Sequence, residues 1–324
     1  MNAPPPADMR IRPEHQAEID NRQRTRPARL QSITAMRPLP APAVEAITDP
    51  ATVQAEVEAF LARHRHLAVL TGAGISTASG IPDYRGVDGQ WQRGSPITYQ
   101  GYMHDTALRA RYWRRSFVGW PMLRTARPNA AHLALARWAH AGRISGLITQ
   151  NVDGLHAQAG QPRVIDLHGR IDRVQCMDCG CQFSRDDIQA RLQQDNPHWV
   201  KQQATQTPDG DADVDEAALP GFVAPVCPAC GGMLKPDVVF FGESVPAARV
   251  RETEAIIADA DALLVVGSSL MVYSGYRFAR LAAQLGKPIA LLTLGRTRAD
   301  DLATHRWQVD CGVLGGMNVQ PITG

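Results

Sequence analysis

The chain has 324 residues, and its 34 lysines and arginines against 32 aspartates and glutamates leave a formal net charge of +2. This length predicts about two domains with a substantial buried core, while the small net charge gives no reason to expect nucleic acid or a membrane surface as a partner. No apolar run approaches the ~20 residues of a membrane span, so we expect a soluble protein.

The first 44 residues are rich in Pro, Arg and Gln and poor in large apolar side chains. This composition predicts a disordered N-terminal extension. Its arginines resemble those of an organelle transit peptide, but four acids argue against one: Asp8, Glu14, Glu18 and Asp20. We therefore expect a cytoplasmic protein, if the source is bacterial, rather than a protein of an organelle matrix.

A glycine-rich stretch follows a predicted helix, Thr52–Arg63, and a short apolar strand, His66–Leu70. It reads TGAGISTASGIPDYR, and its Gly72 and Gly74 would let the backbone approach a pyrophosphate at the carboxyl end of the strand. Thr77 stands where the dehydrogenase fingerprint G-x-G-x-x-G has its third glycine, so hydride transfer is not indicated.

The same stretch predicts that the helix beginning there is short. Gly80 and Pro82 would end it after little more than one turn. The following residues are therefore expected on a loop folded back over the ligand: Asp83, Tyr84 and Arg85.

Two C-x-x-C pairs indicate a metal site. They consist of Cys176, Cys179, Cys227 and Cys230, and four thiolates close a tetrahedral zinc shell with no position left for water. One structural zinc ion in a reducing compartment is therefore predicted. Cys181 leaves a C-G-C alternative open, although the C-x-x-C spacing on both sides favours Cys179 as the ligand.

Strand and helix patterns alternate along the chain without a repeat. Further strands are expected at 144–149, 163–167, 238–241, 262–266 and 288–292, with helices at 130–140 and 276–285 and a helical insertion at about 86–128 that includes a helix at 108–118. Alternation of this kind predicts an α/β fold with a doubly wound, parallel, Rossmann-like sheet. Residues 45–170 and 232–324 would form this domain, and 171–231 a smaller zinc-ribbon plus helical module.

Polar side chains follow the ends of several predicted strands. His168 follows the strand at 163–167, and Asn151 and Asp153 follow the strand at 144–149. Because the carboxyl ends of parallel strands share one edge of the sheet, an imidazole there could act as a general base beside amide and carboxylate groups that hold a ribose. Each residue also has a structural interpretation, since single histidines usually pack and Asn and Asp commonly form turns.

Six motifs, in this order, resemble those of the sirtuins. They are GAGIS…GIPDYR, TQNVDGLH, the pair His168-Gly169, the two C-x-x-C pairs, KPDVVFFGE from Lys235 and GSSL from Gly267. The resemblance covers about Leu67 to Val313. Three further stretches, RYWRRSFVGWP, VYSGYRF and TRADDLA, resemble the class II branch, to which a mitochondrial sirtuin of animals belongs.

The resemblance implies an NAD-dependent protein-lysine deacylase that consumes NAD as a co-substrate. In this family the acyl oxygen of a modified lysine attacks the nicotinamide ribose and nicotinamide leaves, after which the histidine, here His168, takes a proton from a ribose hydroxyl. The products are lysine, nicotinamide and 2′-O-acyl-ADP-ribose. The implied partners are acyl-lysine proteins or peptides, with no nucleic acid and no membrane. The peptide is expected to pair as a strand along the segment after Gly242. The oligomeric state stays open, and a monomer is plausible.

The resemblance also assigns NAD contacts. Asn151 and Asp153 join His168 as catalytic residues. The nicotinamide would lie by Asp83 and Val152, and the ribose by Gln150, Asn151 and Asp153. The phosphates would lie by Gly72, Ala73, Gly74, Arg85, Gly267, Ser268 and Ser269, with Tyr84 on the covering loop; the adenosine would lie by Thr293, Leu294, Gly295 and Cys311. Thr293 stands where the family usually has Asn, and its shorter side chain predicts weaker NAD binding.

The acyl group and one alternative chemistry stay open. Tyr112 and Arg115 have the Tyr-x-x-Arg spacing with which another sirtuin class recognises a carboxylate at the acyl tip, but the arginines at 109, 111, 114 and 115 could equally form a solvated helix face. Mono-ADP-ribosyl transfer would use the same cleft. A non-catalytic NAD and zinc-ribbon binding module is the third interpretation, which the presence of His168, Asn151 and Asp153 disfavours.

Overall fold

Six parallel strands form the large sheet, in the order β11-β10-β9-β1-β2-β3. The computed structural model describes residues 39–83, 96–199, 205–206, 212–213, 221–317 and 319–321. The strands are β1 (Leu67–Thr71), β2 (Ile144–Thr149), β3 (Val164–Asp166), β9 (Ala262–Val266), β10 (Ile289–Leu292) and β11 (His305–Trp307). The chain builds outward from β1 to β3 and then returns to place β9 on the other side of β1, so the topological switch point lies between β1 and β9. The doubly wound, Rossmann-like fold class is confirmed.

The central strands are buried on both faces, as their continuous apolar sequences predict. Every residue of β1 and β9 is buried, and the two strands pair in parallel from Leu67 with Ala262 to Thr71 with Val266. Apolar runs of this kind suit a parallel sheet because helices cover both of its faces.

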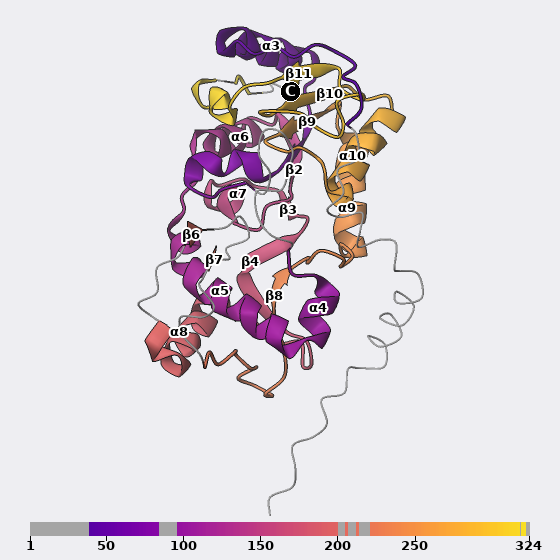
Figure 1. Ribbon diagram of the computed structural model, residues 1–324. Helices are drawn as coiled ribbons and strands as arrows, with labels where there is room; N and C mark the ends of the chain where they lie inside the picture. The colour runs from indigo at the N-terminus through magenta and orange to yellow at the C-terminus, as the bar shows by residue number, and fades with distance from the viewer. Residues whose placement is uncertain are drawn as a thin grey trace, which may run out of the picture.

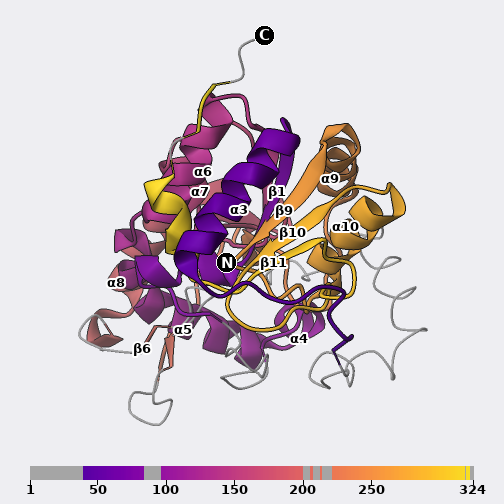
Figure 2. The same cartoon turned by 90° about the horizontal axis from the view of Figure 1, so that it is seen from above.

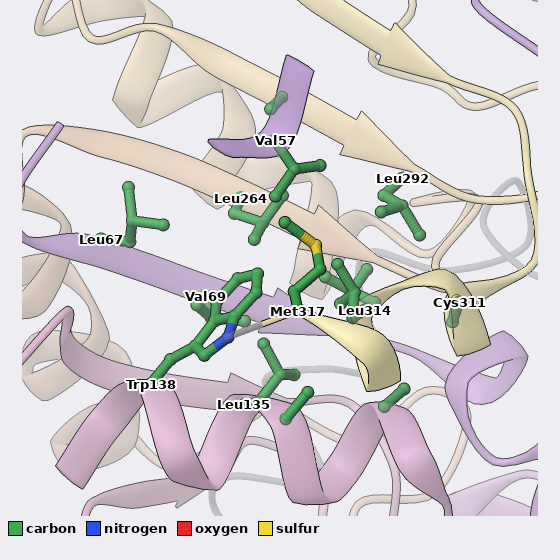
Figure 3. Packing of buried hydrophobic residues seen from close by; sticks show 14 of the residues in the cluster. Val57, Leu67, Val69, Leu135, Trp138, Leu264, Leu292, Cys311, Leu314 and Met317 are labelled. Atoms are coloured by element: carbon green, nitrogen blue, oxygen red, sulfur yellow. The ribbon is translucent and has the colours of Figure 1, made fainter. Parts of the chain in front are cut away.

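Helices cover the two faces of the sheet, as Figure 2 shows from above. One face carries α3 (Pro50–Arg63), α6 (Ala130–His140) and the 3-10 helix η4 (Cys311–Gly316), and the other carries α9 (Ala247–Asp259) and α10 (Tyr273–Gln284). On the first face Trp138 and Leu135 of α6 pack with Leu314 of η4 and Val69 of β1 (Figure 3). These apolar contacts fix the helices that border the strand ends.

A second, smaller sheet lies beyond the carboxyl ends of the parallel strands (Figure 1). Its order is β5-β4-β8, with all neighbours antiparallel. The bounds are β4 (Gly169–Cys176), β5 (Gln182–Ser184) and β8 (Leu234–Val238), and its helices are α8 (Arg185–Asp195), α4 (Tyr99–His104) and α5 (Thr106–Thr125). Tyr102 and Trp113 of the helical insertion share one core with Val174, Ile188 and Leu234 of this sheet and its helix. The insertion therefore packs on the cysteine-bearing segment.

The predicted strand at 238–241 is wrong. Strand β8 ends at Val238, and Phe241 makes only an isolated bridge to Thr98. The apolar run Val238-Val-Phe-Phe241 was interpreted as a buried strand of the parallel sheet, but its residues are only half-buried because they lie between the two sheets.

Helix α5 continues past the predicted end at Val118 and passes through Pro121. A proline in a helix lacks the amide that would bond to the carbonyl four residues earlier, here that of Phe117. The Gln189 side chain of α8 donates to the Phe117 carbonyl instead, over 2.9 Å. A neighbouring helix thus replaces the bond that proline removes.

Shorter elements complete the described residues: η1 (Ala73–Ile75), η2 (Thr77–Ser79), α7 (Leu155–Gln158), η3 (Pro197–Trp199), β6 (Thr205–Gln206) and β7 (Ala212–Asp213). Residues 1–38 of the N-terminal extension, which the sequence predicts to be disordered, lie outside the described residues. From there the chain runs toward the edge of the large sheet, where Ile47 bridges Trp307. No described helix combines the length and apolarity needed to cross a bilayer.

Candidate active site and metal centre

Two glycine loops touch at the switch point between β1 and β9. The amide of Gly74, after β1, donates to the carbonyl of Gly267, after β9, over 2.8 Å. Gly267 has φ +62°, and a Cβ atom there would lie 2.3 Å from the Ile75 nitrogen; a Cβ atom on Gly72 would lie 2.7 Å from the Ser268 hydroxyl oxygen. The glycines therefore let the two loops approach each other, in addition to leaving space for a pyrophosphate.

The chain after β1 ends its helical turn early, as predicted, but it does not form an α-helix. It forms the two 3-10 turns η1 and η2, and Gly80 ends the second in the left-handed region at φ +84°. Asp83 follows half-buried, and burial raises the pKa of its carboxyl group above the usual range. Tyr84 and Arg85 lie outside the described residues.

The residues after β2 bind the first glycine loop through side chains. Asn151 Nδ2 donates to the Gly72 carbonyl over 3.1 Å and to the Ser76 hydroxyl over 3.0 Å. Ser76 in turn donates to the Asp153 carboxylate over 2.7 Å. The structure therefore brings Asn151 and Asp153 together with the loop that precedes Asp83.

Gln150 connects the same strand end to the second glycine loop. Its Nε2 donates to the Ser268 hydroxyl over 2.7 Å, and Ser268 also accepts the Leu270 amide over 3.2 Å. Ser269 is half-buried beside it, and its carbonyl accepts the Arg298 amide over 2.9 Å. The predicted ribose residues Gln150, Asn151 and Asp153 are therefore hydrogen-bonded to the two glycine loops.

His168 follows β3 and lies against the same group. Its Nδ1 bonds to the Gln150 carbonyl over 2.9 Å and its Nε2 to the Ser274 hydroxyl over 2.8 Å. Burial lowers the pKa of His168 to about 4, so the imidazole is neutral at neutral pH. A neutral imidazole at the carboxyl edge of the sheet is able to accept a proton.

Two further histidines lie buried beneath the site. The rings of His132 and His156 are 4.7 Å apart between centroids, and His156 Nε2 bonds to the Thr71 hydroxyl over 2.9 Å. Burial lowers the pKa of His132 to about 4 and lowers that of His156 well below its usual value. Both rings are therefore neutral in the folded protein.

The predicted adenosine residues follow β10 and begin η4. Thr293 is buried, and its amide donates to the Trp307 carbonyl over 3.1 Å. Leu294 is 52% exposed, and Gly295 follows it with φ +79°. Cys311 packs in the core beside Leu314 (Figure 3), and burial raises the pKa of its thiol to about 12, which makes it unreactive.

The four predicted metal-binding cysteines lie together. Their sulfur atoms are all within 4.8 Å of one another, with Cys176 Sγ 3.6 Å from Cys230 Sγ and Cys179 Sγ 3.7 Å from Cys227 Sγ. A tetrahedral site with Zn–S bonds of about 2.3 Å needs sulfur atoms about 3.8 Å apart, so the cluster fits one zinc ion. The first knuckle begins at the end of β4 and the second precedes the start of β8, two antiparallel strand ends that pair at Cys176 and Leu234, and zinc would join them.

A buried ion pair supports the segment between the two sheets. Lys235, 6% exposed, lies 3.1 Å from the Glu243 carboxylate and donates to the Val238 carbonyl over 2.6 Å. Glu243 also accepts the Phe240 amide over 2.9 Å. The pair therefore fixes the turn of residues 239–242, which leads into the segment after Gly242 where the peptide substrate is expected.

The sequence analysis missed two residues that hold parts of the site by hydrogen bonds from other helices, Asn129 and Ser274. Asn129 caps α6 and also donates to the Ile75 carbonyl over 2.7 Å, so one side chain holds both a helix and the first glycine loop. Its position between Pro128 and an apolar helix is an N-cap signal that could have identified it. The contact of Ser274 with His168 has no such local signal.

Comparisons with known proteins agree on one family. The model of the Sir2 family matches residues 72–274. An NAD-dependent protein deacetylase of Xanthomonas campestris pv. campestris (strain 8004) is 55% identical over 255 residues, which cover 79% of this chain and 87% of that protein. The NAD-dependent protein lipoamidase sirtuin-4, mitochondrial, of Homo sapiens is 47% identical over 270 residues, covering 82% and 85%.

Solved structures give the same result. The structure "Sir2-p53 peptide-NAD+" superposes with a TM-score of 0.65 at 31% identity, covering 80% of this chain and 94% of that one. "Structure of Sir2Tm bound to a propionylated peptide" superposes with a TM-score of 0.64 at 28% identity, covering 81% and 95%.

The metal centre predicts different effects for two neighbouring cysteines. Cys227→Ser removes a ligand, so we expect zinc content to fall from about one ion per chain to none, and the melting temperature to fall by about 10 °C or more. Cys181→Ser, the matched control, is expected to keep both. Atomic absorption and thermal unfolding measure this, and loss of zinc from Cys181→Ser as well as from Cys227→Ser would show that the C-G-C alternative is correct.

The buried histidines predict loss of stability in mild acid. Their pKa values are lowered in the folded state, so the unfolded chain, in which histidine titrates near 6.5, binds more protons below that pH. Their contribution to stability should be complete above pH 6.5 and decline toward pH 4, by up to about 1.4 kcal/mol per pH unit for each histidine.

Urea unfolding at pH 7.5, 6.5 and 5.5 measures this slope. His132→Phe should give a shallower slope than the wild type, whereas His66→Gln, which changes an exposed histidine, should keep the wild-type slope. Parallel slopes for His132→Phe and the wild type would contradict the assignment.

Proposed function

This chain is a member of the Sir2 family, and on that premise we propose which of its residues carry out the reaction. It is an NAD-dependent protein deacylase, which removes acyl groups from lysine and consumes NAD. The residue roles that follow are our proposal, and they are supported by the positions of the side chains at the β1/β9 switch point.

The single observation that carries the proposal is the environment of His168. Its Nδ1 bonds to a carbonyl oxygen, which only accepts hydrogen bonds, so Nδ1 carries the proton and Nε2 is the basic nitrogen. Burial lowers the pKa of this imidazole to about 4, which keeps Nε2 unprotonated at neutral pH. We assign His168 as the general base that takes a proton from a ribose hydroxyl once nicotinamide has left.

The residues around His168 would position NAD. The ribose would lie by Gln150, Asn151 and Asp153, which are bound to both glycine loops and are therefore held in place before NAD arrives. Asp83 and Val152 would face the nicotinamide. The phosphates would lie by Gly72, Ala73, Gly74, Gly267, Ser268 and Ser269, and the adenosine by Thr293, Leu294, Gly295 and Cys311; Tyr84 and Arg85 complete the proposed set.

Zinc would have a structural role. Four thiolates fill its coordination shell, so no position remains for a water or substrate. The ion would join the two knuckles of the small sheet, whose core also packs on Tyr102 and Trp113 of the helical insertion.

We propose that the acyl groups removed are uncharged. The Tyr112 ring is 5% exposed and contacts the rings of Tyr102 and Phe240 at 5.4 and 5.3 Å, an aromatic cluster that suits an apolar chain near the peptide segment. A Tyr and Arg pair that recognises a carboxylate would need both polar ends directed at the acyl tip. The names of the relatives, a deacetylase and a lipoamidase, also refer to uncharged acyl groups.

The base assignment predicts the effect of removing the imidazole. His168→Ala should lower steady-state release of nicotinamide with NAD and an acetyl-lysine peptide by about 100-fold or more, because no group then accepts the ribose proton. His104→Ala, which changes an exposed histidine at the end of α4, is the control, and its rate of nicotinamide release should equal that of the wild type. Turnover by His168→Ala within threefold of the wild type would remove the proposed role.

The acyl preference predicts a rank order of substrates. Acetyl- and lipoyl-lysine peptides should give a kcat/KM about 10-fold or more above that of succinyl- and glutaryl-lysine peptides, because burial of an unpaired carboxylate is unfavourable. Arg115→Ala should leave this order unchanged. A preference for succinyl or glutaryl that disappears in Arg115→Ala would instead establish carboxylate recognition.

A further inference from the structure

The basic nitrogen of His168 has a hydroxyl partner on a distant helix. Ser274 lies in the first turn of α10, and its Oγ is 2.8 Å from His168 Nε2, although the two residues are 106 positions apart in the chain. A serine hydroxyl near the start of a helix often accepts the helix's own amides, but the N-cap of α10 is Val272 and no side chain caps this helix. The Ser274 side chain is directed to the imidazole instead.

The chemistry of both partners fixes the direction of this bond. His168 Nδ1 is the protonated nitrogen because it bonds to the Gln150 carbonyl, so Nε2 of the neutral ring has only a lone pair to offer. Ser274 must therefore donate its hydroxyl proton to Nε2. A hydroxyl is also able to accept, so the same group could receive a bond from Nε2–H once the imidazole is protonated.

The bond belongs to a closed ring of contacts that joins His168 to the loop before α10. Gln150, whose carbonyl bonds to His168, donates from its side chain to Ser268, and Ser268 accepts the Leu270 amide. Ser274 completes the ring by returning to His168.

Two backbone features show that this loop is held against His168 by its surroundings. Leu270 has φ +54°, the one positive φ of a non-glycine residue in the described part of the chain, and its side chain is 1% exposed. A residue keeps such a conformation only where its environment determines it. Gly275 lies so close to Gln150 that a Cβ atom would be 2.4 Å from Oε1. The first turn of α10 is therefore fitted to the Gln150 and His168 pair.

We propose that Ser274 is a positioning residue for the reaction, which orients the His168 ring by donating to its unprotonated Nε2 and then stabilises the imidazolium that the reaction forms. This inference depends on the proposed role of His168 as base. In the proton transfer the ribose O–H bond breaks and an Nε2–H bond forms. When the ribose oxygen moves on to its acyl target, Ser274 Oγ turns from donor to acceptor and bonds to Nε2–H, keeping its own proton.

The experiment compares two steps of one reaction in Ser274→Ala and Ser274→Thr. His168 acts after nicotinamide has left, so exchange of labelled nicotinamide into NAD does not need the base, whereas deacylation does. Ser274→Ala should lower kcat for deacylation about 10-fold, the value of one hydrogen bond to a charged group, and leave nicotinamide exchange within about twofold of the wild type. Ser274→Thr retains the hydroxyl and should recover most of the lost kcat.

A second measurement is independent of turnover. Nitrogen NMR of the ligand-free protein at pH 7, with the His168 signals assigned by their loss in His168→Gln, should show one Nδ1–H tautomer in the wild type and in Ser274→Thr. Ser274→Ala should keep this tautomer, because the Gln150 carbonyl remains, but its Nε2 signal should move toward that of a nitrogen that accepts no hydrogen bond. The control Tyr273→Phe removes a hydroxyl from the adjacent residue, which is 53% exposed, and should match the wild type in both assays.

The outcomes separate this inference from the proposed function. Equal deacylation and an unchanged Nε2 signal in Ser274→Ala would overturn the role of Ser274 while leaving His168 as base. Equal losses of exchange and deacylation, not recovered by Ser274→Thr, would also overturn it, because they would indicate disruption of the loop. An inactive wild type would contradict the proposed function itself.

Discussion

The active site depends on the contact between two backbone turns at the switch point of the large sheet. The Gly74 amide bonds to the Gly267 carbonyl over 2.8 Å, and neither turn has room for a side chain where they meet. This contact places the ends of β1 and β9 edge to edge, so the side chains that follow β2 and β3 reach both turns. A bulky residue at either turn would separate the groups proposed to bind NAD from those proposed to act on it.

Burial is the main cause of the lowered pKa values of the histidines at the site. The imidazoles of His132, His156 and His168 all have lowered pKa values because they lie in a poorly solvated region beneath and beside the strand ends. The lowered pKa values keep the proposed base neutral at physiological pH, and they also reduce the stability of the folded protein in acid. Tautomer selection adds to this, since the Gln150 carbonyl leaves one nitrogen of His168 available.

Features encoded in short stretches could be predicted from the sequence, and features that join distant stretches could not. The strands Ile144–Thr149 and Ala262–Val266 have the predicted bounds because their apolar runs are local, and the cysteine spacing identified the four sulfur atoms that lie together. The contacts of Ser274 with His168 and of Gln189 with the Phe117 carbonyl join separate elements, so no spacing reveals them. The apolar run at 238–241 misled the prediction because a half-buried connecting segment and a buried strand share the same composition.

The most direct test of the account is the mass of the products formed from NAD and an acetyl-lysine peptide. The account predicts nicotinamide, the free-lysine peptide and O-acetyl-ADP-ribose in equal amounts, with the acetyl group moved from lysine to ribose. A peptide or protein that keeps its acetyl group and gains ADP-ribose would contradict it, because the same site would then direct a different nucleophile to the ribose.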